Sequence, residues 1–543
     1  MSSNGSPSVR PLPVLGALRL GRPSDIWFKP ALSVVVAVAP PNLTLVALDR
    51  LDLAMYTMAG SLCALYAHNR PYATRARVLA LVVLGMLGSL AGALVTASLT
   101  SNAVVLVTVG ALLAAAQKAV CDATRLGPPG NVIFAFVMSA ALFVPQTLAQ
   151  VPGHLALAAA AGAWAWIVGM APALPRPHGP ERRAVAGALH AAAAHAGTGD
   201  PAARARAAAA VHAAWQTLLA SGARPAARQA LERLVVRAEI ALAAPADTDP
   251  EELRRLARAL RGTGAVPRAG DLGAAAGEVL GAEIERATPT PPWWRGLGPL
   301  APIAVRTAVG CALAGYASLA IGVGRPYWAL VTAAALYQVN ITLTWNRAVQ
   351  RVVGNLVGVL VFAAVAPLAH LHPLALVLCC LAFNFGAEAL ISRNYWLGSV
   401  CVTPMALLIT EFAHVERTGE LMTDRILDTL VGAVVGFLAA IAVTNRRAGD
   451  RLERAVAAVE SAREHAVRTL AAPSAAPGAV EAARRHLAAA LVDLRATADA
   501  AAGEWWQRAL PEERVVSAEQ AGHRTLAATV RQRTQHTAEG AGA

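Results

Sequence analysis

The sequence predicts an all-α polytopic membrane protein with about 12 transmembrane helices. Apolar residues make up 56% of its 543 residues and charged residues only 15%, against about a quarter in ordinary soluble domains. The apolar residues gather in two blocks, and basic residues recur on alternate connections between the apolar segments. Two blocks with the same even number of segments indicate two parallel six-helix repeats.

The blocks divide the chain into five regions. These are a cytoplasmic N-terminal segment (1–30), a first transmembrane repeat (31–174), a helical cytoplasmic domain (175–300), a second transmembrane repeat (301–444) and a helical cytoplasmic C-terminal domain (445–543). In both cytoplasmic domains, Ala, Arg and Leu at helical spacing predict amphipathic helices, for example over 226–243 and 251–260.

Proline, glycine and polar residues divide each block into six segments that approach or reach the length needed to cross ~30 Å of hydrocarbon. Pro40 and Pro41 lie inside the first segment and predict a kink or a break there. The predicted spans are 31–51, 53–67, 78–98, 103–121, 131–149, 154–173, 303–322, 327–343, 348–367, 372–391, 395–412 and 426–444.

The basic residues orient these spans. With the N-terminus in the cytoplasm, nineteen basic residues lie on inner segments and four, Arg50, Arg325, Arg417 and Arg425, on outer ones. Such a bias follows the rule that Lys and Arg remain on the cytoplasmic side. We therefore expect a multi-pass protein of the bacterial inner membrane with both termini in the cytoplasm.

Several classes of function are excluded. The net charge of +13 is spread along the connections without a concentrated basic stripe, which argues against nucleic-acid binding. The only lysines are Lys29 and Lys118, so there is no phosphate-binding loop of the ATPases. No nucleophile–base cluster or metal-binding motif is evident, and we expect neither an enzyme nor a cofactor or metal.

The two blocks share an offset of about 270 residues, which is the signature of an internal repeat. Arg77 then corresponds to Arg347, and each third span carries glycines that allow close helix packing. The predicted packing glycines are Gly88, Gly92, Gly354, Gly358, Gly432 and Gly436. A pseudo-twofold axis along the membrane normal would place a site or path between the halves.

Arginines inside the membrane are candidates for binding an anion, because the guanidinium stays charged and can hold a carboxylate with two hydrogen bonds. Arg347 and Arg351 are four residues apart and share one helix face, and Arg77 is the repeat counterpart. Arg351 is the deepest of the three in its span. The alternative is that these arginines only anchor helix ends at the inner surface.

Aromatic and amide side chains accompany these arginines. Tyr327 and Trp328 begin the eighth span, where they could stack on an aromatic substrate or form part of an interfacial aromatic belt. Gln338 and Asn340 could hydrogen-bond a substrate or join helices.

Proton coupling needs an acidic side chain inside the membrane. Glu388 lies in the tenth span, about one turn from Arg393, so an interfacial ion pair is the alternative reading. Asp424 and Asp428 share a face at the mouth of the twelfth span. Asp428 is the deeper of the two, and pairing with an intramembrane arginine would explain it structurally.

The second block also carries an ordered set of motifs. They are Gly324-Arg-Pro-Tyr-Trp, Trp345-Asn-Arg-Ala-Val-Gln-Arg, Gly354-x-x-x-Gly, Arg393-Asn-Tyr-Trp, Thr403-Pro and Asp424-Arg-Ile-Leu-Asp-Thr-Leu-Val-Gly. In this order the segment Arg306–Asn445 resembles the fusaric acid resistance / aromatic acid exporter family, which is itself distantly like the aluminium-activated malate transporters of plants. The first block matches only loosely.

The resemblance implies efflux of aromatic carboxylic acids driven by the proton gradient. We therefore expect a secondary transporter that exports small organic anions, with arginines holding the carboxylate. A passive organic-anion channel and a structural or assembly protein of the cell envelope are the alternatives. Expected partners are the anion and the lipid bilayer, and a periplasmic partner stays undefined.

Overall fold

A computed structural model of the protein describes residues 14–21, 26–221, 225–243, 245–262, 264–267, 297–412, 417–443, 448–472, 477–502 and 512–541. Most of the predicted N-terminal segment 1–30, residues 268–296 of the predicted domain 175–300 and the predicted boundary at 444/445 lie outside these residues. The predicted boundary at 300/301 falls inside a helix that begins at Leu297. Among the described residues every regular element is helical.

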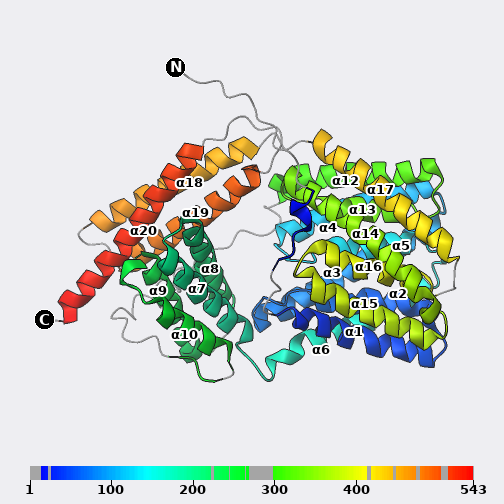
Figure 1. The fold of residues 1–543 in the computed structure, drawn as a ribbon, viewed down its shortest axis with the longest axis horizontal. Helices are drawn as coiled ribbons and strands as arrows, with labels where there is room; N and C mark the ends of the chain where they lie inside the picture. Colours follow the sequence, from blue (N-terminus) through cyan, green and yellow to red (C-terminus); the bar gives the residue numbers. More distant parts are fainter. Residues whose placement is uncertain are drawn as a thin grey trace, which may run out of the picture.

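The helices form two groups at opposite ends of the molecule (Figure 1). The bundle contains α1 (Phe28–Ala47), α2 (Ala54–Ser61), α3 (Tyr72–Leu99), α4 (Ala103–Ala123), α5 (Val132–Leu142), α6 (Val151–Met170), α12 (Leu297–Ile321), α13 (Tyr327–Leu336), α14 (Ile341–Ala369), α15 (Pro373–Ile391), α16 (Tyr395–Thr410) and α17 (Thr418–Ala442). The other group contains α7 (Gly179–Thr198), α8 (Pro201–Leu219), α9 (Pro225–Ala243), α10 (Pro250–Arg261), α18 (Ala448–Ala471), α19 (Pro477–Ala502) and α20 (Glu512–Ala541). Short 3₁₀ helices are η1 (Gly16–Leu18), η2 (Leu51–Leu53), η3 (Leu62–Leu65), η4 (Ala171–Ala173) and η5 (Pro245–Asp247).

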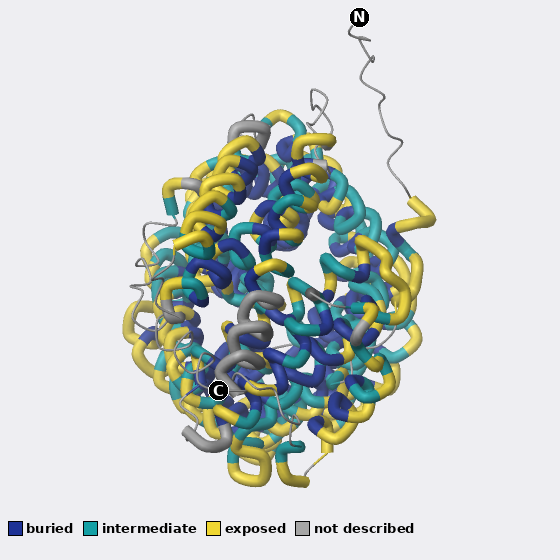
Figure 2. Tube along the Cα trace, turned by 90° about the vertical axis from the view of Figure 1, so that its left-hand side faces the viewer, coloured by how far each residue is buried: buried dark blue, intermediate teal, exposed yellow. Residues whose placement is uncertain are grey.

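The bundle has the surface of a membrane protein. Large apolar side chains such as Leu81, Leu84, Leu360 and Leu438 are more than half exposed on its outside, and Figure 2 shows exposed residues around a buried interior. Such a surface is costly in water and favourable in lipid. Eight bundle helices, α1, α3, α4, α6, α12, α14, α15 and α17, are long and apolar enough to span a membrane. The protein is therefore a polytopic membrane protein.

The other four apolar segments are only 10–17 residues long, and they are Leu51–Leu65, Val132–Leu142, Tyr327–Leu336 and Tyr395–Thr410. The last three are shorter than predicted, whereas Leu51–Leu65 keeps the predicted length and begins two residues earlier. The helix predicted over 327–343 ends at Leu336 because Asn340 instead caps the next helix: its Oδ1 accepts a hydrogen bond from the Leu343 N–H at 2.8 Å. The segment predicted over 131–149 ends its helix at Leu142, shortly before Pro145.

The first span stays helical despite its two prolines. Pro40 lacks the N–H that would bond the carbonyl of Val36 four residues earlier. The indole Nε1–H of Trp164 donates to that carbonyl at 3.0 Å. The predicted break is therefore absent, because a side chain from α6 replaces the lost backbone hydrogen bond.

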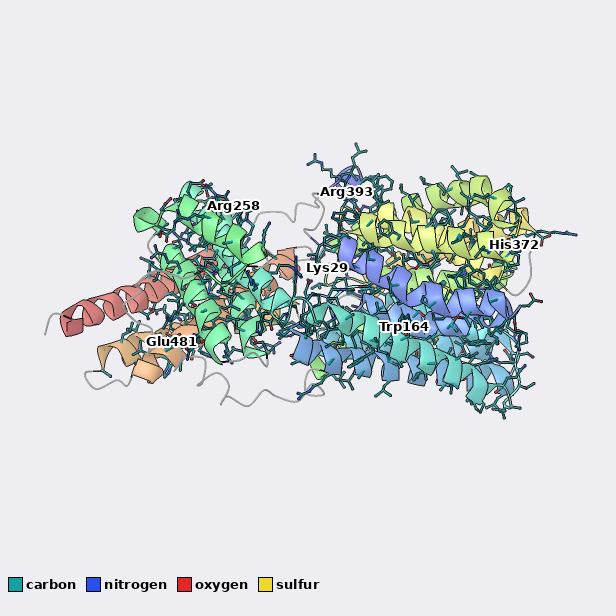
Figure 3. The ribbon with its side chains drawn as sticks, turned by 90° about the horizontal axis from the view of Figure 1, so that it is seen from below. Lys29, Trp164, Arg258, His372, Arg393 and Glu481 are labelled. Carbon is teal, nitrogen blue, oxygen red and sulfur yellow. The ribbon has the colours of Figure 1, made fainter. Side chains whose placement is uncertain are left out.

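The two blocks pack in the same pattern. In the first block α2 and α3 both pack on α6, and α3 packs on α5; in the second block α13 and α14 pack on α17, and α14 packs on α16. Between the blocks, α4 packs on α12 and the equivalent pair, α1 and α15, packs in the same way. Figure 3 places Lys29 and Arg393 at the bundle end that faces the other helices, and His372 at the far end.

Close packing uses only some of the predicted glycines. A Cβ on Gly354 or Gly358 would meet the backbone of α16, and a Cβ on Gly432 would meet the backbone of α13. Gly436 lies against Ala333 in the same way. The expectation for Gly88 and Gly92 needs correction.

Gly88 is exposed with nothing within 4 Å of an added Cβ, and Gly92 meets only the side chain of Leu113. The buried face of α3 instead carries Leu79, Val82, Met86 and Leu90. The close approach in the first block occurs where Gly60 of α2 lies against the backbone of α6.

This difference predicts opposite effects of the same substitution. Gly354→Ala should lower the free energy of unfolding by about 1–3 kcal/mol, because its Cβ would collide with Ser399 and the Trp396 carbonyl. Gly88→Ala should leave it unchanged or raise it by up to about 1 kcal/mol, since alanine favours helix and the space is open. Thermal unfolding of the purified protein in detergent measures both, and equal shifts would contradict this packing.

The second group of helices comes from both predicted cytoplasmic domains. The predicted helices at 226–243 and 251–260 are present as α9 and α10. Leu189, Trp215 and Leu234 belong to the core of α7–α10, and Leu452 and Leu487 to that of α18–α20. The two regions also touch each other, since α19 packs on α8 and α20 on α9.

Candidate functional site

Buried polar side chains concentrate on the facing sides of five helices in the second block. We call this set the polar ladder; each of its ten members is at most 5% exposed. The polar ladder consists of Ser318 on α12, Trp328 and Thr332 on α13, Arg351 and Asn355 on α14, Ser399 and Thr403 on α16, and Arg425, Asp428 and Thr429 on α17.

Helical spacing brings these residues to one face of each helix. Arg425, Asp428, Thr429 and Gly432 follow at intervals of three, one and three residues on α17, so the glycine that packs on α13 directs the polar face inward. Gly354 and Gly358 do the same for α14, because they draw Arg351 and Asn355 towards α16.

Asn355 joins three helices at the centre of the polar ladder. Its Oδ1 accepts from the Nε–H of Arg425 at 3.1 Å and from the Thr403 hydroxyl at 2.8 Å. Its Nδ2–H donates to the Thr429 hydroxyl oxygen at 2.7 Å. This single amide therefore fixes the position of the Arg425 side chain, which is only 2% exposed.

Arg425 and Asp428 bring two charges into the bundle. The Arg425 guanidinium lies 5.1 Å from the centre of the Trp328 ring, within the range of a cation–π interaction. One Asp428 oxygen accepts a hydrogen bond from the Ser318 hydroxyl at 2.5 Å. The other oxygen, Oδ2, and the Nη1 of Arg425 are buried without a hydrogen-bond partner among the described residues.

The end of the bundle nearer α7–α10 and α18–α20 holds two more arginines. Arg351 Nη1–H donates to the Tyr395 hydroxyl at 2.8 Å, and its Nε is buried without a partner among the residues described. The guanidinium of Arg347 lies 3.9 Å from the centre of the Tyr395 ring and is half-buried. Tyr395 thus holds both guanidinium groups.

At the opposite end Arg325 and Asp424 form an ion pair of 3.3 Å. Arg325 also lies over the Trp328 ring at 5.4 Å, so Trp328 is flanked by two guanidinium groups. Charged and polar side chains therefore extend from one end of the second block to the other.

Buried groups without partners point to a ligand. An unpaired buried donor or acceptor costs about 1–3 kcal/mol, and more if charged. Arg351, Arg425, Asp428, Trp328 and Thr332 each carry such an atom among the described residues. An arrangement with donors from two arginines and one nearby carboxylate can bind an anion and exchange a proton.

The remaining predicted residues lie elsewhere. Arg77 is exposed, and the buried arginine of that region is Arg75, whose Nη2 lies 3.1 Å from His68 Nδ1. Tyr327 is buried and faces Phe143 of the first block at a ring distance of 5.7 Å. Glu388 is half-buried on α15, and no ion pair joins it to Arg393 among the described side chains.

Gln338 and Asn340 occupy the break between α13 and α14. The Nε2–H of Gln338 donates to the carbonyl of Tyr337 at 3.3 Å. Asn340 donates through Nδ2–H to the carbonyl of Ala500 in α19 at 3.2 Å, in addition to capping α14. The two amides therefore shape the end of the bundle that faces α19.

A basic cavity of about 480 Å³ opens beside this break. It lies between α4 of the first block, α12 of the second and α18. Lys118, Arg125, Arg306 and Arg451 line it, together with Gln338 and one acid, Asp122. This cavity would concentrate anions at the end of the bundle that faces α7–α10 and α18–α20.

The N-terminal segment covers the α14–α16 side of the polar ladder. Asn394 Nδ2–H donates to the carbonyls of Ala17 and Arg19 at 3.0 and 2.8 Å. Trp396 and Gln350 donate to the carbonyls of Leu18 and Ala17 at 3.1 and 2.8 Å. The segment is thus attached next to Arg351 and Tyr395.

Comparison with known proteins places the polar ladder in a family domain. Residues 311–439 match the family described as fusaric acid resistance protein-like. This segment is thus similar to a fusaric acid resistance protein-like domain. The resemblance predicted from the motifs is thus confirmed, and all ten residues of the polar ladder lie inside the matched range. This family is a transporter-like membrane family and is not a known enzyme family.

One curated relative also matches. It is the "Uncharacterized membrane protein YvaC" of Bacillus subtilis (strain 168), 34% identical over 143 residues. The aligned segment covers 26% of this chain and 22% of that relative. No solved structure matches the chain.

Proposed function

We propose that the protein is a secondary transporter that exports small organic anions, aromatic carboxylates above all, across the bacterial inner membrane. The observation that carries this proposal is the polar ladder, in which Arg351, Arg425 and Asp428 are buried with unpartnered polar atoms inside an apolar bundle. The fusaric acid resistance protein-like domain implies a transporter role and supports the same reading.

In this proposal the blocks are two parallel repeats of six crossings with both termini in the cytoplasm. The equivalent packing of α1–α6 and α12–α17 supports the repeat. The four short segments would cross where neighbouring helices shield their non-helical ends from lipid. Anions would collect in the basic cavity at the inner end and then bind along the polar ladder.

The carboxylate would be held by Arg425 and Arg351. Trp328 is fully buried between Arg425 and Arg325, so an aromatic ring bound there could contact the edge of the indole. Arg77 is left out of the site because it is exposed, whereas Arg347 remains at its inner end.

Asp428 would carry the coupled proton, since its Oδ2 has no hydrogen-bond partner among the described residues and could accept a proton beside Arg425. Asp424 is held by Arg325 at the outer mouth.

The test is transport of phthalate and succinate in proteoliposomes, with and without an imposed pH gradient. Phthalate remains charged at neutral pH and does not leak through lipid. We expect saturable phthalate flux that speeds up when the receiving side is acidified. Flux that ignores the pH gradient would identify a passive anion channel, and no flux of any anion would favour a structural protein of the envelope.

A further inference from the structure

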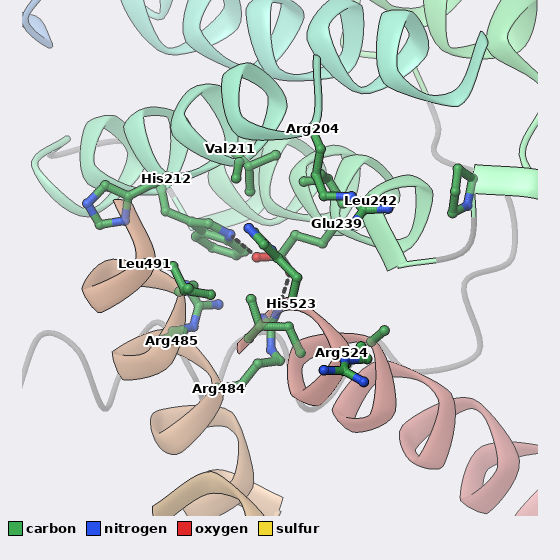
Figure 4. Close-up of a pocket in the computed structure, with 16 residues that line it drawn as sticks. Arg204, Val211, His212, Glu239, Leu242, Arg484, Arg485, Leu491, His523 and Arg524 are labelled. Carbon is green, nitrogen blue, oxygen red and sulfur yellow. Dashed lines mark hydrogen bonds and ion pairs between the residues drawn. The ribbon is translucent and has the colours of Figure 1, made fainter. Parts of the chain in front are cut away.

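A second basic cavity lies between the two cytoplasmic domains (Figure 4). Its volume is about 460 Å³, and α8, α9, α19 and α20 form its walls. Arg204, Arg484, Arg485 and Arg524 line it with a single carboxylate, Glu239. Figure 4 shows arginine side chains from three helices converging on this space.

Arg484 is held by carboxylates. It pairs with Glu239 at 2.8 Å and with Glu481 at 2.5 Å. Burial alone would lower the pKa of Arg484, but Glu239 and Glu481 raise that pKa above its ordinary value. Arg484 therefore ties α19 to α9, and its charge is balanced within the protein.

Arg485 is held in place, although two of its nitrogen atoms have no hydrogen-bond partner among the described residues. It is 5% exposed, its Nε–H donates to Glu481 at 2.7 Å, and its guanidinium stacks on Trp215 at 3.7 Å from the ring centre. Its Nη1 and Nη2 are buried without a hydrogen-bond partner among the residues described. Two coplanar donors in a fixed orientation match the two oxygens of a carboxylate.

The rest of the cavity adds positive charge and an apolar wall. Arg204 carries another buried and unpartnered atom, Nε. Burial, together with the charge of Arg204, lowers the pKa of His523 to about 4, so at neutral pH the positive charge comes from the arginines. Val211, Leu491 and Leu526 supply the apolar surface.

We propose that this cavity binds a small carboxylate with an apolar body, and that the bound ligand holds α8 and α19 together. The carboxylate would lie against the Nη1 and Nη2 of Arg485, and the apolar part against Val211, Leu491 and Leu526. This binding does not depend on the transport proposed above.

Helices α8 and α19 each form a hydrogen bond with one membrane block, at equivalent positions of the two blocks. At the end of α8 the Ala220 carbonyl accepts from the Thr74 hydroxyl of α3 at 2.7 Å. Near the end of α19 the Ala500 carbonyl accepts from Asn340, which caps α14. Because α3 and α14 are equivalent helices of the two blocks, a ligand between α8 and α19 restrains the blocks relative to each other.

Calorimetric titration of benzoate into the full-length protein in detergent tests the proposal. Arg485→Gln should weaken benzoate binding on the order of 10- to 100-fold, the effect of losing hydrogen bonds to a charged group. Ala527→Glu, which adds a negative charge to a half-buried wall residue, should weaken it as well if Arg485→Gln fails to fold. Arg258→Gln, on the exposed face of α10, is the matched control and should bind as the wild type does.

Two further ligands and one further variant separate the outcomes. Benzamide has the same ring without the charge and should not bind, and inorganic phosphate should bind more weakly than benzoate. Arg351→Gln weakens the polar ladder only, so the benzoate binding that Arg485→Gln removes should persist in Arg351→Gln. The proposal is overturned if benzoate binding is lost in Arg351→Gln but kept in Arg485→Gln and Ala527→Glu, or if phosphate binds as tightly as benzoate.

Amide hydrogen exchange measures whether the bound ligand restrains α8 against α19. In wild type, benzoate should slow amide hydrogen exchange in α8 and α19, and in Arg485→Gln it should not. Unchanged exchange in both proteins would contradict the restraint of α8 against α19.

Discussion

Arg425→Gln should lower the maximal rate of phthalate transport in proteoliposomes on the order of 10- to 100-fold, which corresponds to about 1.5–3 kcal/mol for hydrogen bonds to a charged group. Arg425 is the buried arginine at the centre of the polar ladder, with Asn355 on its Nε and no described partner on its Nη1. Without its charge, moving an anion through the apolar bundle becomes costlier.

Arg77→Gln is the matched control for Arg425→Gln. The same change removes one arginine charge from the bundle, but at an exposed position of α3. Its transport should stay within about twofold of wild type, as expected for a surface charge. Equal losses in the two variants would show that general charge, and not the Arg425 site, controls transport. Size-exclusion elution of the purified variants is the control for folding, and both should elute as the wild type does.

Asp428→Asn should abolish the response of phthalate flux to an imposed pH gradient while leaving downhill flux measurable. Asparagine keeps the size and can still accept from Ser318, which bonds one Asp428 oxygen at 2.5 Å, but it cannot take up a proton. The expected result is that acidifying the receiving side accelerates wild type and not the variant. The measurement is the ratio of the initial rates with and without the gradient.

Glu388→Gln distinguishes between Glu388 and Asp428, two of the three acids predicted for proton coupling. Glu388 is half-buried on α15 and outside the polar ladder, whereas Asp428 is fully buried within it. If Glu388→Gln loses the pH response and Asp428→Asn keeps it, the assignment of the coupled proton to Asp428 is wrong.

The helices could be predicted well from the sequence, because apolar runs and their breaks are local features. The lengths of the short segments could not. The end of α13 depends on the cap that Asn340 provides to α14, and the continuity of α1 depends on Trp164 from α6. Both are contacts between residues of different helices, which hydropathy does not record.

The site could be predicted only in part. Motif spacing finds Arg351, Trp328 and Asp428, which the structure buries in the polar ladder together with Asn355, Thr403 and Thr429. The sequence prediction assigns Arg425 to an outer segment because the predicted span begins at residue 426, whereas the helix begins at Thr418. The packing of α17 on α13 through Gly432 turns its side chain inward.

In the first block, too, the sequence does not predict which side chain is buried. An offset of about 270 residues aligns Arg77 with Arg347, but the arginine that becomes buried there is Arg75, two residues earlier. Two residues along a helix correspond to opposite faces. The repeat predicts which helices correspond and does not predict which side chain faces inward.

The central claim is that the anion binds in the second block, along the polar ladder. The most direct test compares the KM for phthalate in Arg351→Gln with that in Arg75→Gln, because each removes one buried arginine from equivalent helices of the two blocks. We predict that Arg351→Gln raises KM on the order of tenfold or more and that Arg75→Gln leaves it near the wild-type value. An equal rise in both variants would contradict the account and place the anion between the blocks.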